Sequence, residues 1–137
     1  MARDIFHDVV RTALETEGWT ITADPLRFEF GSVKFQVDLA AEQVLAAERS
    51  GEKIAVEIKS FLRASAVTDF YGALGQFLSY RLALENIEPD RLLYLAVPAD
   101  AYKDFFGLEF TQAAIKTYQI RLIVYDTLTQ EIVQWIS

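Results

Sequence analysis

Residues 53–61 read KIAVEIKSF, and the alternation of side chains along this stretch decides the fold prediction. A repeat of two predicts a β-strand with apolar side chains on one face and charged or small side chains on the other. The apolar face carries Ile54, Val56 and Ile58, and the opposite face carries Lys53, Ala55, Glu57 and Lys59. Glu57 and Lys59 therefore project from the same face, about 7 Å apart along the strand.

The sequence upstream predicts a partner strand at residues 33–39, where VKFQVDL alternates in the same way. Its apolar face carries Val33, Phe35, Val37 and Leu39, and its polar face carries Lys34, Gln36 and Asp38. Residues 44–58, VLAAERSGEKIAVEI, predict a hairpin that turns at Ser50-Gly51, with Glu48 near its tip. If the polar faces of the two strands align, the carboxylates of Asp38 and Glu57 meet beside the ammonium group of Lys59.

A site made of Asp38, Glu57 and Lys59 suits a hard divalent cation. Carboxylate oxygens are preferred ligands of Mg²⁺ and Mn²⁺, so we expect Asp38 and Glu57 to bind the metal. The chain has no cysteine and a single histidine, which excludes a thiolate site. Lys59 would orient a nucleophile or offset charge that develops on a phosphate. A solvent-exposed strand face gives the same pattern, and the spacing D-x(18)-E-x-K alone does not separate the two readings.

The rest of the chain adds helices and strands in an order typical of an α/β domain. We predict helices at 4–17, 66–85, 99–106 and 109–118, and strands at 19–23, 27–30, 91–97, 120–126 and 131–135. This order predicts one domain over residues 1–137, with a mixed β-sheet flanked by α-helices. The long helix also has a narrow face of small or polar residues that would approach a sheet closely, formed by Gly72, Ala73, Gln76 and Ser79. An amide on such a face needs hydrogen-bond partners, which makes Gln76 a candidate site residue.

Composition limits the location and the partners of the chain. The net charge of −7 and the pI near 4.7 oppose simple electrostatic binding to nucleic acid. Residues 27–63 are less acidic, because they hold six basic and six acidic groups. No apolar stretch approaches the roughly 18 residues needed to cross a bilayer, and MARDIFHDVV is charged where a signal peptide is apolar. We therefore expect a cytoplasmic protein without a membrane segment.

The order of these blocks resembles the PD-(D/E)XK nuclease superfamily, whose fold is restriction-endonuclease-like. The matching blocks are VDLA (37–40), AVEIKSF (55–61) and a long helix with Gln76 and Tyr80. The opening FHDVVRTALETEGWTIT is similar to the first helix and strand of archaeal Holliday-junction resolvases. More narrowly, ARDIFHDVV, EGWTIT, VDLAAE, AVEIKSF, ALGQFLSYR and LYLAVP together resemble the XisH-type family of excision controlling factors.

The family resemblance implies control of the programmed excision of a DNA element in cyanobacteria. It implies DNA, a separate recombinase and a small XisI-type companion as partners. The superfamily resemblance implies Mg²⁺- or Mn²⁺-dependent hydrolysis of DNA phosphodiesters. A catalytically inactive accessory domain that acts through protein contacts is the alternative. A symmetric dimer is expected only because it is the commonest assembly.

The resemblance also assigns the remaining candidate residues. Resolvase-like members carry a metal-site glutamate on the first helix, and the position aligned with it is His7, followed by Asp8. His7 would suit general-base chemistry at neutral pH, whereas a partly buried helix histidine is the alternative reading. We expect Gln76 to orient the active-site strand or a water. Tyr80 is expected in the core, the carboxylates of Glu42 and Glu48 in solvent, and the rings of Trp19, Trp135, Phe105 and Phe106 in packing.

Overall fold

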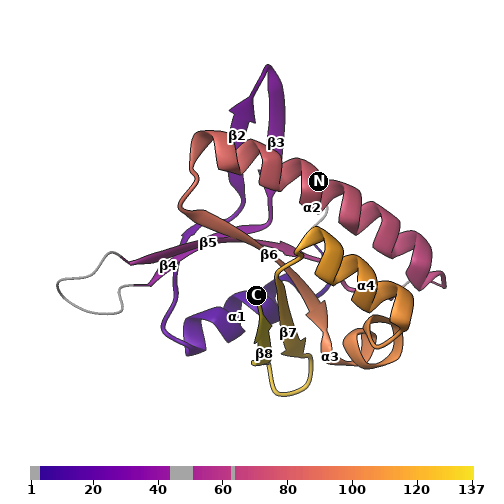
Figure 1. The fold of residues 1–137 in the computed structure, drawn as a ribbon. Helices are drawn as coiled ribbons and strands as arrows, with labels where there is room; N and C mark the ends of the chain where they lie inside the picture. Colours follow the sequence, from indigo (N-terminus) through magenta and orange to yellow (C-terminus); the bar gives the residue numbers. More distant parts are fainter. Residues whose placement is uncertain (1–3, 44–50, 63) are drawn as a thin grey trace.

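A computed structural model describes residues 4–43, 51–62 and 64–137 of the chain. The main sheet has six strands in the order β1-β4-β5-β6-β7-β8 (Figure 1). These strands are β1 (Thr20–Ala23), β4 (Leu39–Gln43), β5 (Glu52–Ile58), β6 (Arg91–Pro98), β7 (Leu122–Asp126) and β8 (Glu131–Ile136). The three central strands β5, β6 and β7 are parallel, and the outer strands pair antiparallel. The predicted mixed sheet flanked by helices is confirmed.

Helices cover both faces of this sheet, so each face has its own hydrophobic core. On one face the core includes side chains of α2 (Ala66–Ile87), α4 (Glu109–Tyr118) and the strands facing them. On the other face α1 (His7–Thr16) packs its apolar side on alternate residues of the same strands. Along β5, Ala55 therefore faces α2, while Ile54 and Val56 face α1. The strand face that the sequence marked as polar is covered by a helix.

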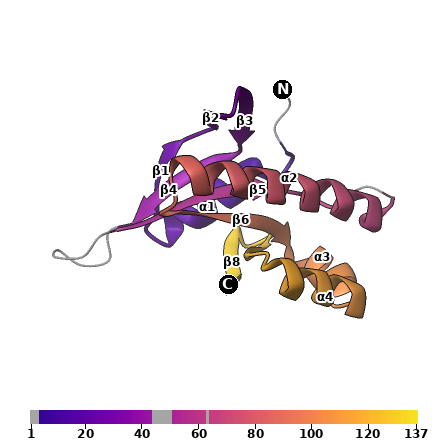
Figure 2. The ribbon, with the colours of Figure 1, turned by 45° about the horizontal axis from the view of Figure 1, so that its top comes forward.

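The predicted single strand at 33–39 is wrong, because the chain breaks at Asp38. β3 (Val33–Val37) ends before this residue, and β4 begins after it. β3 pairs only with β2 (Leu26–Phe30) in a separate two-stranded sheet, in which Phe28 opposes Phe35. This β2–β3 arm projects past α2 (Figures 1 and 2). β4 then pairs antiparallel with β5, with Gln43 opposite Glu52, so the upstream partner of β5 is residues 39–43 rather than the segment from residue 44 that the hairpin prediction used. Glu48 and Ser50 of that prediction lie outside the described residues.

The long helix α2 packs through its apolar side, as the spacing of Phe70 and Phe77 predicts, and not through the narrow face of small residues, of which only Ala73 is buried. Ser65 caps its N-terminus by accepting a hydrogen bond from the Thr68 backbone N–H. The buried side chains are those of Phe70, Ala73, Phe77, Ala83 and Leu84, whereas Gly72, Gln76 and Ser79 of the small-residue face are exposed. Aromatic rings remove much more apolar area from water than small side chains do, so Phe70 and Phe77 determine which face packs.

The other elements follow the predicted order with shifted ends. The first helix begins at His7 rather than at residue 4, and the segment 99–106 is a short α-helix, α3 (Ala99–Ala101), followed by a π-helix, η1 (Tyr102–Phe106). Packing roles are confirmed for four aromatic residues, because Trp19 packs on Trp135 and both Phe105 and Phe106 pack on Phe70. No helix within the described residues is both long and apolar enough to cross a membrane.

Candidate functional site

The break between β3 and β4 places the Asp38 carboxylate beside the end of β5. Asp38 Oδ2 accepts a hydrogen bond from the Ile58 backbone N–H (2.8 Å), and the Asp38 backbone N–H is 3.4 Å from Glu57 Oε1. The antiparallel register of β4 and β5 pairs Leu39 with Val56, so the next position upstream brings Asp38 to Glu57. The structure thus brings the two predicted carboxylates into direct contact.

Glu57 is a buried acid, with 8% of its side chain exposed. Burial, and after it the nearby negative charge of Asp38, raises the pKa of Glu57 from 4.5 to about 8. Lys59 acts in the opposite direction, because its Nζ lies 3.6 Å from Glu57 Oε2. At neutral pH the Glu57 carboxyl therefore retains its proton and hydrogen-bonds to the Asp38 side chain.

Backbone contacts fix the position of Lys59 just beyond β5. Its N–H donates to the Ala96 carbonyl of β6 (3.0 Å), and its own carbonyl accepts from the buried Tyr125 hydroxyl (3.5 Å). The next N–H, that of Ser60, donates to Asp4 Oδ2 (3.0 Å) at the start of the α1 region. The half-buried ammonium group of Lys59 therefore lies beside the Glu57 carboxyl group, on the open side of the Asp38–Glu57 pair.

The carboxylate pair opens into a cavity of about 780 Å³ between α2 and the β2–β3 arm. Gln76 and Tyr80 of α2 line it, together with Asp38, Glu57 and Lys59. Burial, and after it the charges of Glu57 and Asp38, raises the pKa of Tyr80 from 10 to about 12. Gln76 and Lys59 also line a second cavity of about 370 Å³ farther along α2. The predicted Gln76 thus lies between two cavities, and Tyr80 borders the site as well as packing on Phe35.

His7 is buried near the start of α1, with 3% of the residue exposed. Its Nε2 lies 2.8 Å from Asp24 Oδ1, and Arg11 Nη1 donates to Asp24 Oδ2 (2.6 Å). Within the described residues, His7 Nδ1 has no hydrogen-bond partner. The ring therefore contacts Asp24 through Nε2, and a role of His7 in the metal site stays a prediction. Asp8 is exposed on the same helix.

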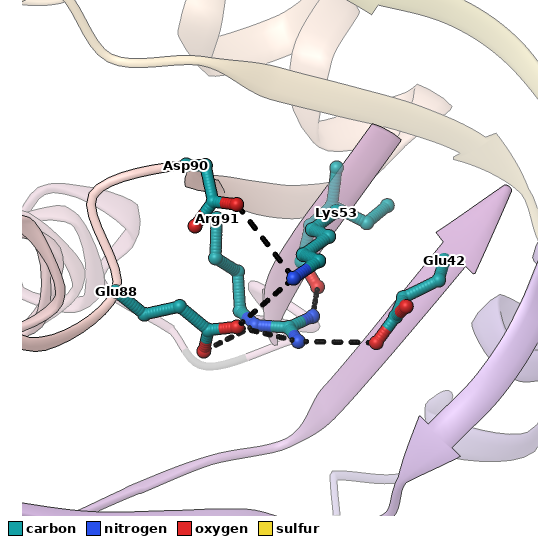
Figure 3. Close-up of polar contacts among 6 residues, drawn as sticks. Glu42, Lys53, Glu88, Asp90 and Arg91 are labelled. Atoms are coloured by element: carbon teal, nitrogen blue, oxygen red, sulfur yellow. Dashed lines mark hydrogen bonds and ion pairs between the residues drawn. The ribbon is translucent and has the colours of Figure 1, made fainter. Parts of the chain in front are cut away.

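Glu42 belongs to a different cluster, at the opposite end of β4 and β5 (Figure 3). The buried Arg91 guanidinium donates to both oxygens of Glu88 (2.8 and 3.0 Å), to Glu42 Oε2 (3.3 Å) and to the Ile54 carbonyl (3.0 Å). The pKa of Arg91 is raised overall by Glu88 and Glu42, which outweigh the opposing effect of burial. This cluster joins the end of α2 to the β4–β5 pair, so the expectation of a purely solvated Glu42 is wrong.

With this geometry established, comparison with known proteins identifies the family. The family model described as XisH protein matches residues 1–133. The chain belongs to the XisH family. An XisH family protein from Nostoc punctiforme PCC 73102 is 50% identical, with a TM-score of 0.88, over 98% of this chain and 100% of its own. A fdxN element excision controlling factor protein from Anabaena variabilis is 51% identical, with a TM-score of 0.89 and the same coverage. A search of curated proteins gave no significant match.

The donor set of this XisH-family chain fits a hard divalent cation. Within residues 4–43, 51–62 and 64–137, no three His, Cys, Asp or Glu side chains lie close enough together to form a metal site. Mg²⁺ commonly binds proteins through one or two carboxylates and keeps waters or substrate phosphate oxygens as its other ligands. Asp38 and Glu57 supply two carboxyl groups in contact, and a cation bound there would replace the Glu57 proton and offset the charge of Asp38 that helps to raise the Glu57 pKa. The contact between these two carboxylates is the observation that supports a metal site.

Proposed function

We propose that this XisH-family chain acts in controlling the excision of a DNA element, and that it does so by metal-dependent hydrolysis of DNA phosphodiesters at Asp38, Glu57 and Lys59. The excision role is supported by the relative from Anabaena variabilis that is described as a fdxN element excision controlling factor. The hydrolytic role is supported by the buried carboxylate pair with an ammonium group at its open side. In this proposal the domain is a restriction-endonuclease-like, PD-(D/E)XK member.

Each side chain has a distinct task in this proposal. Asp38 and Glu57 would hold Mg²⁺ or Mn²⁺, which when bound supplies Lewis acidity toward a phosphodiester and acidifies water. Lys59 would orient the attacking water or offset negative charge on the phosphate, because its Nζ is held 3.6 Å from Glu57. Gln76, which lines the cavity, would orient the active-site strand or a water by hydrogen bonds.

A second candidate function is a catalytically inactive accessory domain in an excision complex. The net charge of −7 favours protein partners over DNA, and Tyr71 and Leu82 expose apolar side chains on the outer side of α2. An XisI-type companion, a recombinase and a second copy of the chain are the partners proposed for this role. The two functions differ in one measurable property, which is cleavage of DNA.

A nuclease assay tests the hydrolytic function. Duplex, nicked and branched DNA are incubated with Mg²⁺, Mn²⁺ or EDTA, and wild type is compared with Glu57→Gln and Lys59→Ala. Glu42→Gln is the matched control, because Glu42 lies on the neighbouring strand at the opposite end from the site. We expect metal-dependent cleavage by wild type and by the control, and a loss of at least about 100-fold in the two site variants. Equal cleavage by all four proteins, or none by any, contradicts the proposal.

A further inference from the structure

The β2–β3 arm lines the site cavity with aromatic rings. Phe28 and Phe35 are cross-strand partners, and their rings stack with centroids 5.3 Å apart and an interplanar angle of 13°. Tyr80 of α2 meets Phe35 edge-on, at 6.0 Å and 89°. All three rings line the cavity that also contains the carboxylate pair. The arm and α2 therefore contribute aromatic rings to the same cavity as the carboxylate pair.

These rings are only half-buried. A two-stranded sheet is only marginally stable by itself and needs contacts with the rest of the domain. Phe28 and Tyr80 pack on the main core, and this contact explains part of the burial of the rings. Packing alone does not require that the rings border an open cavity together with charged groups. An aromatic face of this kind is the surface on which nucleic-acid bases stack, irrespective of their sequence.

Positive groups border the same cavity. Arg27 and Lys34 line it from the arm, and Lys59 lines it from the end of β5. The opposing charges are those of Glu29 and the carboxylate pair, and a divalent cation on the pair would leave the cavity net positive. A positively charged groove combined with aromatic side chains is the arrangement that binds a single polynucleotide strand.

The dimensions favour one strand over two. A cavity of about 780 Å³ lies in the range of roughly 300–1,000 Å³ that is typical of small-ligand sites. Such a cavity has the volume to hold one unpaired nucleotide. A base inside a duplex must leave its stack to reach a site of this kind.

We propose that the cavity accepts an unpaired nucleotide of a DNA strand, whose base packs on the ring cluster of Phe28, Phe35 and Tyr80 while its phosphate lies toward Lys59 and the carboxylate pair. This inference rests on the proposed function and narrows its substrate to single-stranded, branched or locally opened DNA. The aromatic surface selects for an accessible base, and Arg27 and Lys34 neutralise the backbone of the same strand.

Binding in Ca²⁺ instead of Mg²⁺ tests the inference separately from hydrolysis. Fluorescence anisotropy is measured with a labelled single strand, a blunt duplex of the same sequence and a duplex with a single-stranded arm. Wild type is compared with Phe35→Leu, which keeps an apolar side chain without a ring, and with Phe35→Trp, which keeps a ring. Phe110→Leu is the matched control, because Phe110 is an exposed aromatic residue on α4 that does not line the cavity.

We expect the single strand and the branched DNA to bind at least about 10-fold more tightly than the blunt duplex. Phe35→Leu should weaken single-strand binding by about 5-fold to 100-fold, while Phe35→Trp and Phe110→Leu retain it. Wild type should also quench 2-aminopurine placed in the single strand, a measurement that needs no variant to fold. Equal affinity for all three DNAs, no quenching, or no binding of any DNA overturns the inference. Cleavage of blunt duplex without a preference for single strands would overturn this inference and support the proposed hydrolysis. Binding that depends on the Phe35 ring, without any cleavage, would support this inference and overturn the proposed hydrolysis.

Discussion

Glu57→Gln tests the buried carboxyl group directly, because glutamine has the same shape and no titratable proton. Glu57 has a raised pKa of about 8 in the folded chain and a normal value of 4.5. A folded-state pKa above the unfolded one means that the native state binds the proton more tightly. The stabilisation of the native state by this bound proton is fully present below pH 4.5 and is lost as the pH rises to about 8.

The slope follows from this shift. Between pH 5 and 7.5 the free energy of unfolding of wild type should fall, relative to Glu57→Gln, by at most about 1.4 kcal/mol per pH unit, and by about 3 kcal/mol in total because the slope decreases near each pKa. Urea unfolding of both proteins in EDTA at several pH values measures this difference. Adding Mn²⁺ at pH 7.5 should stabilise wild type and not the variant, because the cation binds only the native carboxylate pair. A stability difference that stays constant from pH 5 to 7.5 would refute the reasoning.

Three further predictions concern charged side chains around the sheet. Lys59→Met removes the group that lowers the pKa of Glu57, so the pH range of stability loss should extend upward in the same urea titrations. Arg91→Met should reduce the free energy of unfolding by about 3–5 kcal/mol, because Glu42 and Glu88 lose a buried guanidinium partner. Lys53→Met is the control, since it removes only an exposed ion pair of the same cluster, and it should reduce the free energy of unfolding by less than about 1 kcal/mol. Asp24→Asn should destabilise the chain by about 1–3 kcal/mol through its contacts with α1, without changing Mn²⁺ affinity in calorimetry; a large loss of Mn²⁺ affinity would instead connect α1 to the metal site.

The sequence was sufficient to predict the β5 strand, because strand alternation is a local property. The contact of Asp38 with Glu57 followed only on the condition that the polar faces of two strands align, which alternation by itself does not determine. The break at Asp38 was not predictable in this way. Alternation continues from Val37 to Leu39 without interruption, although the Asp38 carboxylate takes the Ile58 N–H that a continued strand would pair. Two strands on either side of one residue can belong to different sheets while the pattern reads as one strand.

Tertiary packing determined the features that the sequence did not indicate. The buried face of α2 depends on the competition between its aromatic and its small residues for the sheet, which the helical period does not resolve. Arg91 begins the apolar run of β6 and looks like a strand-end residue, and its contact with Glu42 spans 49 positions. The aromatic wall of the cavity depends on the β2–β3 arm lying against α2, a long-range contact that carries no local signal.

An anomalous difference map from crystals soaked in Mn²⁺ tests the central claim most directly, namely that Asp38 and Glu57 form a divalent-metal site. The soak is made above pH 8, where the pKa of about 8 favours loss of the Glu57 proton. We expect a peak about 2 Å from an oxygen of each carboxylate, and no such peak in Glu57→Gln. The absence of a peak between the two carboxylates in wild type, or a peak only at the Glu42 and Glu88 cluster, would contradict it.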